Sequence, residues 1–265
     1  MIRQRTEIIA ALGILIGLAV GIRAQDPVQQ GLAIAQEADR RYRGYADFTA
    51  NLTMVLRNAR GQESRRVMRI QGLEVAGDGD KSLCLFDFPT DIKGTALLTY
   101  THKTGDDDQW LYLPALKRVK RIASSNKSGS FVGSEFAYED IASQEPEKYT
   151  YRTLRDEALD GNDCFVIERS PVDRKNSGYS RQVVWIDKAE YRTLKIEHFD
   201  RRNALLKVLT VSGYQHHADR FWRPDRMSMV NPQTGKSTEL IWSDYRFGTG
   251  LKDSDFLKDN LERIR

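Results

Sequence analysis

The sequence lacks the short motifs that mark common catalytic and nucleotide-binding sites. It contains no GxSxG, HExxH or GxxxxGK[ST], which excludes the serine hydrolases, zinc proteases and P-loop proteins that depend on them. Its histidines are few, and the adjacent His216 and His217 point to opposite faces of an extended chain, so they cannot chelate one metal together. Asp106–Asp108 follow a glycine in a turn, where aspartate is favoured for backbone hydrogen bonds. We therefore expect neither an enzyme nor a metal or cofactor.

Cysteine is also scarce, with only Cys84 and Cys164. They lie in separate strand-like runs and form no CxxC or Cys/His metal spacing. One disulfide is possible in an oxidising compartment. Two separate buried thiols fit the sequence equally well.

Long apolar runs are absent except at the N-terminus. Arg3 and Arg5 precede an apolar run over 8–20, and a cleavage site follows at Ala24. This pattern predicts a signal peptide over residues 1–24, since the run is shorter than the roughly 20 residues that span a bilayer. Cleavage would remove three arginines and one glutamate and lower the formal charge from +4 to +2. So small a charge indicates no nucleic-acid partner.

The remaining chain, 25–265, is expected to be one mainly β domain. Residues 27–42 carry apolar side chains at helical spacing, and 46–57 alternate apolar and polar residues with the period of a strand. Turn residues then separate about a dozen further strand-length segments. Such strands must form either two packed sheets or one strongly curved antiparallel sheet, an incomplete barrel. A helix lying against a curved sheet would enclose a core or a cavity.

The most informative stretch is 108–140, which joins an aromatic strand, a basic cluster, a Ser/Gly loop and an acidic, aromatic turn. Trp110 and Tyr112 fit either a core strand or a ligand-binding wall. The basic residues that follow fit either a solvated edge strand or a site for anionic head groups; they include Arg118, Lys120 and Arg121.

The second half of this stretch resembles a lid. Phe131 and Val132 are apolar residues in an otherwise small and polar loop, which is typical of a flap that closes over an apolar ligand. The turn after it is expected to direct its carboxylates toward the basic cluster and its rings inward. Those carboxylates belong to Glu135, Glu139 and Asp140.

The segments QWLYLPALKRVKRI and SGSFVGSEFAYEDI resemble the LolA-like outer-membrane lipoprotein-sorting proteins of Gram-negative bacteria, as do DIKGTALLTY and DSDFLKDNLER. The resemblance implies an incomplete β-barrel whose apolar cavity holds acyl chains in the periplasm. It also implies an inner-membrane transporter of the resistance-nodulation-division type as a partner. A lid arginine is implied too, for which Arg66 and Arg69 are candidates.

We therefore expect a monomeric periplasmic carrier of a lipid or lipoprotein acyl chain. A lipid sensor or adaptor of the same fold is the alternative, because sequence does not separate the two. Alternation and the resemblance together predict a set of cavity-lining residues: Phe48, Leu52, Met54, Leu56, Leu97, Trp110, Tyr112, Phe131, Phe136 and Tyr138.

Overall fold

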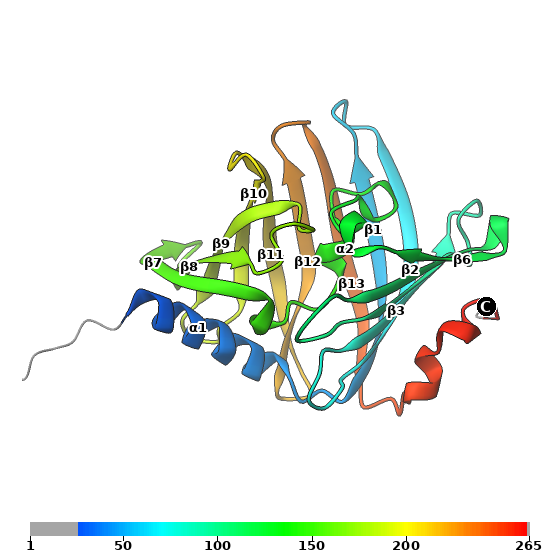
Figure 1. Cartoon of the computed structure of the whole chain (residues 1–265), viewed down its shortest axis with the longest axis horizontal. Helices are drawn as coiled ribbons and strands as arrows, with labels where there is room; N and C mark the ends of the chain where they lie inside the picture. Colours follow the sequence, from blue (N-terminus) through cyan, green and yellow to red (C-terminus); the bar gives the residue numbers. More distant parts are fainter. Residues whose placement is uncertain (1–25, 264–265) are drawn as a thin grey trace, which may run out of the picture.

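The structure, a computed structural model, describes residues 26–263. The predicted signal peptide lies outside the described residues. The chain from residue 47 to 247 forms one 13-stranded antiparallel sheet that curves around a concave face (Figure 1). The expected mainly β fold, a curved sheet with an N-terminal helix, is confirmed.

The strands follow the alternation and the turn residues of the sequence closely. Their bounds are β1 Asp47–Arg57, β2 Glu63–Leu73, β3 Lys81–Phe88, β4 Ala96–Tyr100, β5 Asp108–Leu113, β6 Arg118–Ile122, β7 Tyr149–Leu159, β8 Asn162–Pro171, β9 Tyr179–Asp187, β10 Thr193–Asp200, β11 Leu205–His217, β12 Phe221–Asn231 and β13 Lys236–Phe247.

Helices are fewer and mostly short. The α-helices are α1 (Pro27–Tyr42) and α2 (Tyr138–Ile141), and the 3-10 helices are η1 (Pro114–Leu116), η2 (Ser124–Asn126), η3 (Phe131–Gly133), η4 (Pro146–Lys148), η5 (Asp253–Phe256) and η6 (Lys258–Asn260). Among the described residues, no helix has the length and apolar character needed to cross a membrane.

The sheet consists of two meanders joined in its middle. From this junction β1 to β6 run to one edge, and β13 back to β7 run to the other. The junction pairs β1 with β13, so that Leu52 lies opposite Trp242 and Met54 opposite Leu240. Each half consists of hairpins between neighbouring strands, which explains why the turns could be located from sequence.

Both faces of the sheet are covered along β3 to β5. Met68, Phe86 and Leu97 belong to the main core on the concave side. Leu83 and Leu98 point the other way and pack against Phe256 and Leu261 of the C-terminal segment. This segment lies outside the sheet, beside β3 (Figure 1). Burial on both faces explains why residues 83–86 are continuously apolar.

Helix α1 covers one end of the concave side, next to β7 and β8 (Figure 1). It begins at Asp26, whose carboxylate accepts a hydrogen bond from the backbone N–H of Val28 at 3.0 Å. Gly31 lets it approach β7 closely, because a Cβ there would lie 2.9 Å from the backbone of Arg152. The helix therefore rests directly on a strand backbone.

The two edge strands are joined by residues 123–148, which we call the strap. It leaves β6, passes over the concave face and enters β7. In Figure 1 its helix α2 lies in front of β12 and β13. The strap and α1 together close the concave side of the sheet.

The two cysteines are buried and not bonded to each other. Cys84 lies in the main core, whereas Cys164 packs with Val166 and Trp185 in a separate cluster. Of the two possibilities that the sequence left open, the structure has the free thiols.

Candidate functional site

The apolar residues of the strap point inward and anchor it. Phe131 and Phe136 are each 1% exposed. The Phe131 ring lies 5.9 Å from that of Phe86 on β3 and 5.8 Å from that of Tyr138. The backbone N–H of Phe131 donates to the carbonyl of Phe136 at 2.7 Å, which folds the strap back on itself. The apolar residues of the Ser/Gly loop are thus a plug for the concave side.

An arginine from the sheet holds the strap at this point. The guanidinium of Arg66 on β2 donates to the carbonyl oxygen of Val132, a residue in the left-handed region with φ of 47°. Burial lowers the pKa of Arg66, against the opposing charge of Asp91. Arg69, the other candidate for a lid arginine, instead makes a bidentate contact with Asp87 at 2.9 Å.

The strap's carboxylates do not meet the basic cluster, contrary to our expectation. Glu135 accepts from Asn231 at 2.8 Å, and Glu139 accepts from the hydroxyl of Ser177 and a backbone N–H at 2.8 Å. Asp140 points to the far half of the sheet. The cause is the path of the strap, which carries these residues past β6 to β9, β11 and β12.

Asp140 is the centre of a buried polar group. Its carboxylate pairs with Lys207 of β11 at 2.8 Å and accepts from the hydroxyl of Tyr179 at 2.9 Å. The Lys207 ammonium also donates to the carbonyl of Glu135 at 2.8 Å. Burial would raise the pKa of Asp140, but the charge and hydrogen bond of Lys207 outweigh it and hold the pKa below its ordinary value. The Asp140 carboxylate is therefore ionised at neutral pH.

A second buried chain of polar groups lies beside it. The guanidinium of Arg169 donates to Oε1 of Gln182 at 2.6 Å, which leaves the amide nitrogen of Gln182 to donate to Nδ1 of His198 at 2.9 Å. Burial lowers the pKa of His198 to about 3, so the ring is neutral. Its proton then sits on Nε2, which is buried and has no hydrogen-bond partner.

A cavity of about 690 Å³ lies between the sheet, α1 and the strap. Its floor is formed by inward residues of the central strands, which include Leu52, Ile70, Ile196, Leu209, Val211, Met229 and Leu240. Ala35 and Ala38 of α1 form part of its wall. Small side chains on the helix leave the space that larger ones would fill. The polar groups of Asp140, Arg169 and His198 also reach its surface.

Four of the ten residues predicted to line a cavity are on its wall: Phe48, Leu52, Phe131 and Phe136. Phe48 has room because Gly72 lies opposite, where a Cβ would come within 2.2 Å of the ring. Met54 and Leu97 are buried in the adjoining core, and Leu56 and Tyr138 pack against it.

Trp110 and Tyr112 face away from the cavity, contrary to the prediction. They pack in the convex cluster with Tyr100 and Phe256, while Leu111 between them faces the main core. Both faces of β5 are apolar, so the pattern alone could not fix which face points inward, and a shift of one residue inverts the assignment.

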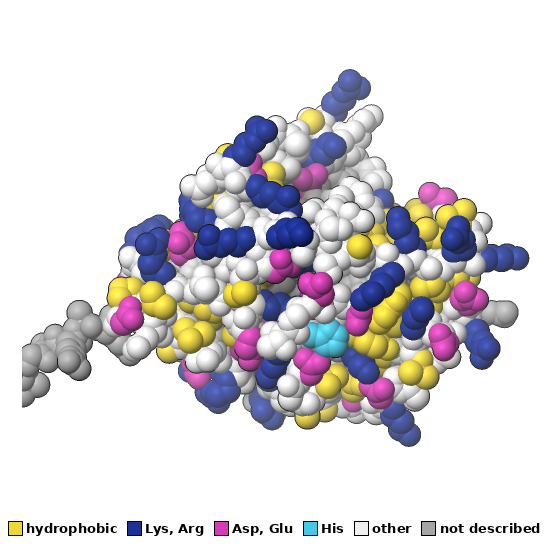
Figure 2. All heavy atoms as spheres, in the orientation of Figure 1, with side chains coloured by type: hydrophobic (Ala, Val, Ile, Leu, Met, Phe, Trp, Pro, Cys, Tyr) yellow, Lys and Arg dark blue, Asp and Glu magenta, His cyan; other side chains and the backbone are white. Residues whose placement is uncertain are grey.

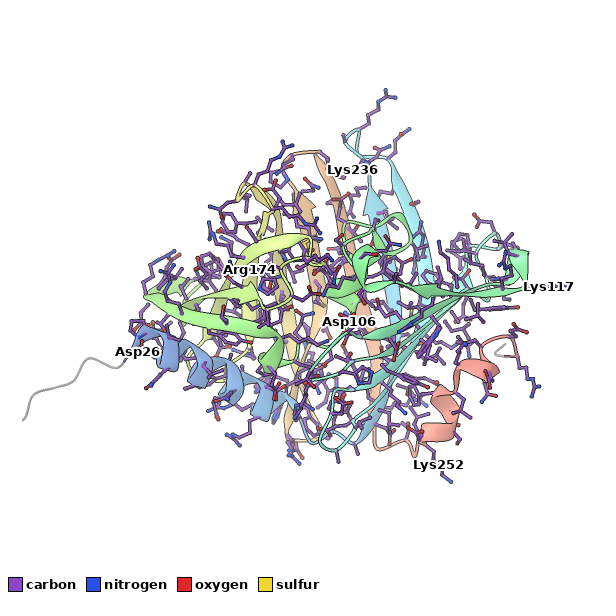
Figure 3. All side chains as sticks on the ribbon, in the orientation of Figure 1. Asp26, Asp106, Lys117, Arg174, Lys236 and Lys252 are labelled. Carbon is purple, nitrogen blue, oxygen red and sulfur yellow. The ribbon has the colours of Figure 1, made fainter. Side chains whose placement is uncertain are left out.

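The basic cluster is remote from the cavity. Arg118 and Lys120 are exposed, and Arg121 pairs with Asp108 across the hairpin. Lys117, just before it, is at the outer tip of the molecule in Figure 3. Lys120 lines a separate recess of about 340 Å³ together with Leu111 and Tyr138. In Figure 2, Lys and Arg side chains are scattered over the visible face among Asp and Glu.

Several residues at the site were not predicted from sequence: Arg169, Tyr179, Gln182, His198, Lys207, Arg223 and Trp242. One of them, Lys207, could have been recognised from sequence. It lies on the same face of β11 as the cavity-lining Leu209 and Val211, and a charged residue on an apolar face is unusual. The others lie in strands whose inward face was not assigned. Within residues 26–263, no group of His, Cys, Asp or Glu side chains is arranged to hold a metal ion.

These features define the protein as an incomplete antiparallel β-barrel with an apolar cavity under a helix and a strap. A family model described as "-like: Uncharacterized protein" matches residues 78–263. No curated protein matches the sequence. The chain belongs to the LolA-like family, as the sequence resemblance indicated.

Two solved structures support this assignment, and a third shares the fold. A crystal structure described as an outer-membrane lipoprotein-sorting protein domain from Vibrio parahaemolyticus is 56% identical, with a TM-score of 0.87 over 89% of this chain and 100% of that one. A DUF1329 family protein from Desulfovibrio piger is 32% identical, with a TM-score of 0.84 over 89% and 99%. A LolA superfamily protein from Nitrosomonas europaea, 22% identical with a TM-score of 0.70 over 86% and 98%, shares the fold.

Proposed function

We propose that this protein is a periplasmic carrier that shields the hydrocarbon chain of a lipid or lipoprotein. The observation that carries the proposal is the cavity of about 690 Å³ between sheet, α1 and strap. Its volume is within the range of about 300 to 1,000 Å³ typical of ligand pockets. The description of the Vibrio relative as a lipoprotein-sorting domain supports the same function.

Binding follows from the apolar floor. Each CH₂ group moved from water into such a site contributes about 0.8 kcal/mol. A chain of ordinary length would therefore bind without any specific polar contact. Four predicted residues, Phe48, Leu52, Phe131 and Phe136, would contact it directly. Met54, Leu56, Leu97 and Tyr138 would support the wall from the adjoining core.

The strap is the part that we expect to move when cargo enters. It carries Phe131 and Phe136 into the concave side, and Arg66 and Lys207 attach it to opposite halves of the sheet. Release of these contacts and of those that Glu135, Glu139 and Asp140 make would expose the floor without breaking a strand pair. We propose that a partner in the inner membrane, a transporter of the resistance-nodulation-division type, supplies the cargo.

The test is native mass spectrometry and lipid extraction on protein purified from a bacterial periplasm without detergent. We expect a stoichiometric hydrophobic ligand, which a vesicle-to-vesicle transfer assay should show to be delivered. Ligand that is bound but never transferred would favour a sensor or adaptor. Protein that is empty and takes up no added lipid would refute a carrier.

A further inference from the structure

Arg223 of β12 is an unusually placed cation. Its side chain lines the cavity, yet the residue is only 2% exposed. Nη1 donates to the carbonyl of Trp222 at 3.0 Å and Nη2 to the carbonyl of Tyr42 at 3.1 Å. Nε is buried and has no hydrogen-bond partner. The guanidinium of this cavity-lining residue therefore has one N–H group that is not hydrogen-bonded.

Arg223 also has no ion-pair partner within 26–263. No carboxylate of the described residues forms a salt bridge with it, whereas Arg192 on the same wall pairs with Asp187 at 2.7 Å. Among the rings around it, that of Tyr42 lies nearest, 3.8 Å from Cζ. A ring offsets part of the cost of burying a cation, but a paired anion is the usual solution.

A second free donor belongs to the same part of the wall. Nε1 of Trp242 is buried without a partner, and Trp242 lines the cavity. The Trp242 ring stacks on that of Tyr245 at 5.8 Å, and Tyr245 in turn stacks on Phe247, whose ring lies 5.4 Å from Cζ of Arg223. The unpartnered donors are thus connected through one aromatic cluster.

The cavity wall has fewer buried acceptors than buried donors without a hydrogen-bond partner, among the residues that the structure describes. Among the described residues that line the cavity, Asp80 has the one buried acceptor oxygen without a hydrogen bond, and that oxygen lies 3.6 Å from Nη1 of Arg43. Arg220 lies at the same end as Arg223, since both guanidinium groups contact the Phe221 ring, at 5.1 and 5.5 Å. This end of the cavity is therefore rich in donors and positive charge.

We propose that Arg223 and Trp242 bind the anionic head group, a carboxylate or phosphate, of an amphiphile whose hydrocarbon chain occupies the cavity. Nε of Arg223 would donate to one anionic oxygen, and Nε1 of Trp242 to the head group or to an ester oxygen next to it. This inference rests on the proposed carrier function, and it narrows the cargo to acidic amphiphiles.

The experiment compares ligands that differ in the head group alone. Delipidated protein is titrated calorimetrically with palmitate and hexadecanol, and with lysophosphatidate and monopalmitoylglycerol. We expect each acid to bind about tenfold or more tightly than its neutral counterpart, since hydrogen bonds to charged groups are the stronger kind. The acid with the greater preference identifies carboxylate or phosphate as the natural head group.

Variants then assign the preference to a residue. Arg223→Gln should bind acids and neutral ligands alike, whereas Arg223→Lys should keep part of the preference. Arg226→Gln is the matched control, because Arg226 lies on the same strand but is exposed and pairs with Glu239. Arg226→Gln should behave as the wild type.

The outcomes separate this inference from the carrier function. Equal binding of acids and neutral ligands by the wild type would overturn the inference and leave the carrier function standing. An unchanged preference in Arg223→Gln would also overturn it. Failure of every ligand to bind would refute the carrier function itself. The comparison of acidic and neutral ligands uses the wild-type protein, so it tests the inference even if Arg223→Gln does not fold.

Discussion

Lys207 of β11 and Asp140 of the strap form a salt bridge of 2.8 Å in which both side chains are less than a tenth exposed. They are 67 positions apart in sequence, and the contact attaches the connection between the two sheet edges to the centre of one half. Loss of one partner leaves the other as a buried, unpaired charge, which is far more costly than the pair itself is stabilising.

We therefore expect Lys207→Met to lower the free energy of unfolding by about 3 to 5 kcal/mol. Urea denaturation followed by circular dichroism measures this. The double variant Lys207→Met/Asp140→Asn should be more stable than the sum of the two single losses predicts. Arg152→Gln is the control, since its pair with Glu168 is 57% exposed on the arginine side and should contribute less than about 1 kcal/mol. Strict additivity would contradict the role of the pair.

His198 should make stability depend on pH below neutrality. Burial lowers the pKa of His198 to about 3, against an ordinary value of 6.5; the charge of Asp140 opposes this, and those of Lys207 and Arg169 add to it. Below pH 6.5 the unfolded chain takes up a proton that the folded protein does not, so stability falls as pH decreases. The loss should be about 1 kcal/mol per pH unit between pH 6 and 5. Urea denaturation at both pH values measures it, and His198→Gln should remove this part of the slope. An equal slope in both proteins would show that other groups cause it.

Arg66 should control the local stability of the strap more than that of the sheet. Arg66→Gln loses a charged donor to the carbonyl of Val132, a contact worth about 1.5 to 3 kcal/mol. We expect faster amide hydrogen exchange in 129–137, with little change in β11 to β13. Arg65→Gln on the same strand is the control, because Arg65 is exposed and its contact with Thr53 is long, at 3.4 Å. Uniform acceleration across the sheet would refute a local role.

Filling the cavity from the helix side should block lipid uptake. Ala35 faces the cavity and Ala33 is exposed on the same helix. Ala35→Trp should therefore reduce the lipid that co-purifies several-fold, whereas Ala33→Trp should not. Lipid extraction and mass spectrometry of both variants provide the comparison. Equal lipid content would place the cargo elsewhere, for example in the recess beside Lys120.

The convex cluster should contribute to stability and not to lipid binding. Phe256 is fully buried against the outer face, and the Tyr100 hydroxyl donates to its carbonyl. Phe256→Ala should cost about 3 to 5 kcal/mol, as truncations of buried aromatic residues do. Its exposed neighbour Leu257 should tolerate the same change. Thermal unfolding and lipid extraction of both variants test this, and a loss of lipid in a folded Phe256→Ala protein would contradict the division between the two faces.

Much of the fold could be predicted from sequence because most strands pair with a strand that is next to them in the chain. Residues 46–57 alternate at every position but Val55. Turn residues separate nearly every pair of strands, so hairpin partners are neighbours in the chain. Phe131 was recognisable as a plug because it is apolar in a Ser/Gly loop. These features need no knowledge of distant segments.

The parts that could not be predicted depend on distant segments. The face to which Trp110 points is decided by Phe256, more than a hundred residues further on. The partner of Asp140 depends on where the strap crosses the sheet. It is Lys207 and not the basic cluster that lies closer in sequence. Arg223 gave no sequence signal, because its lack of a counter-charge is a property of the assembled cavity.

The pairing of β1 with β13 has a consequence for how the chain folds. The two strands are about as far apart in sequence as any pair in the protein, with Asn51 bonded to Asp244 across 193 positions. Each half can form from neighbouring hairpins, but their junction must wait until the last strand is available. Because non-local pairing is slow, we expect joining of the two completed halves to be the rate-limiting step of folding. Until then, β1 and β13 each have one unpaired edge, to which a strand of another chain could pair.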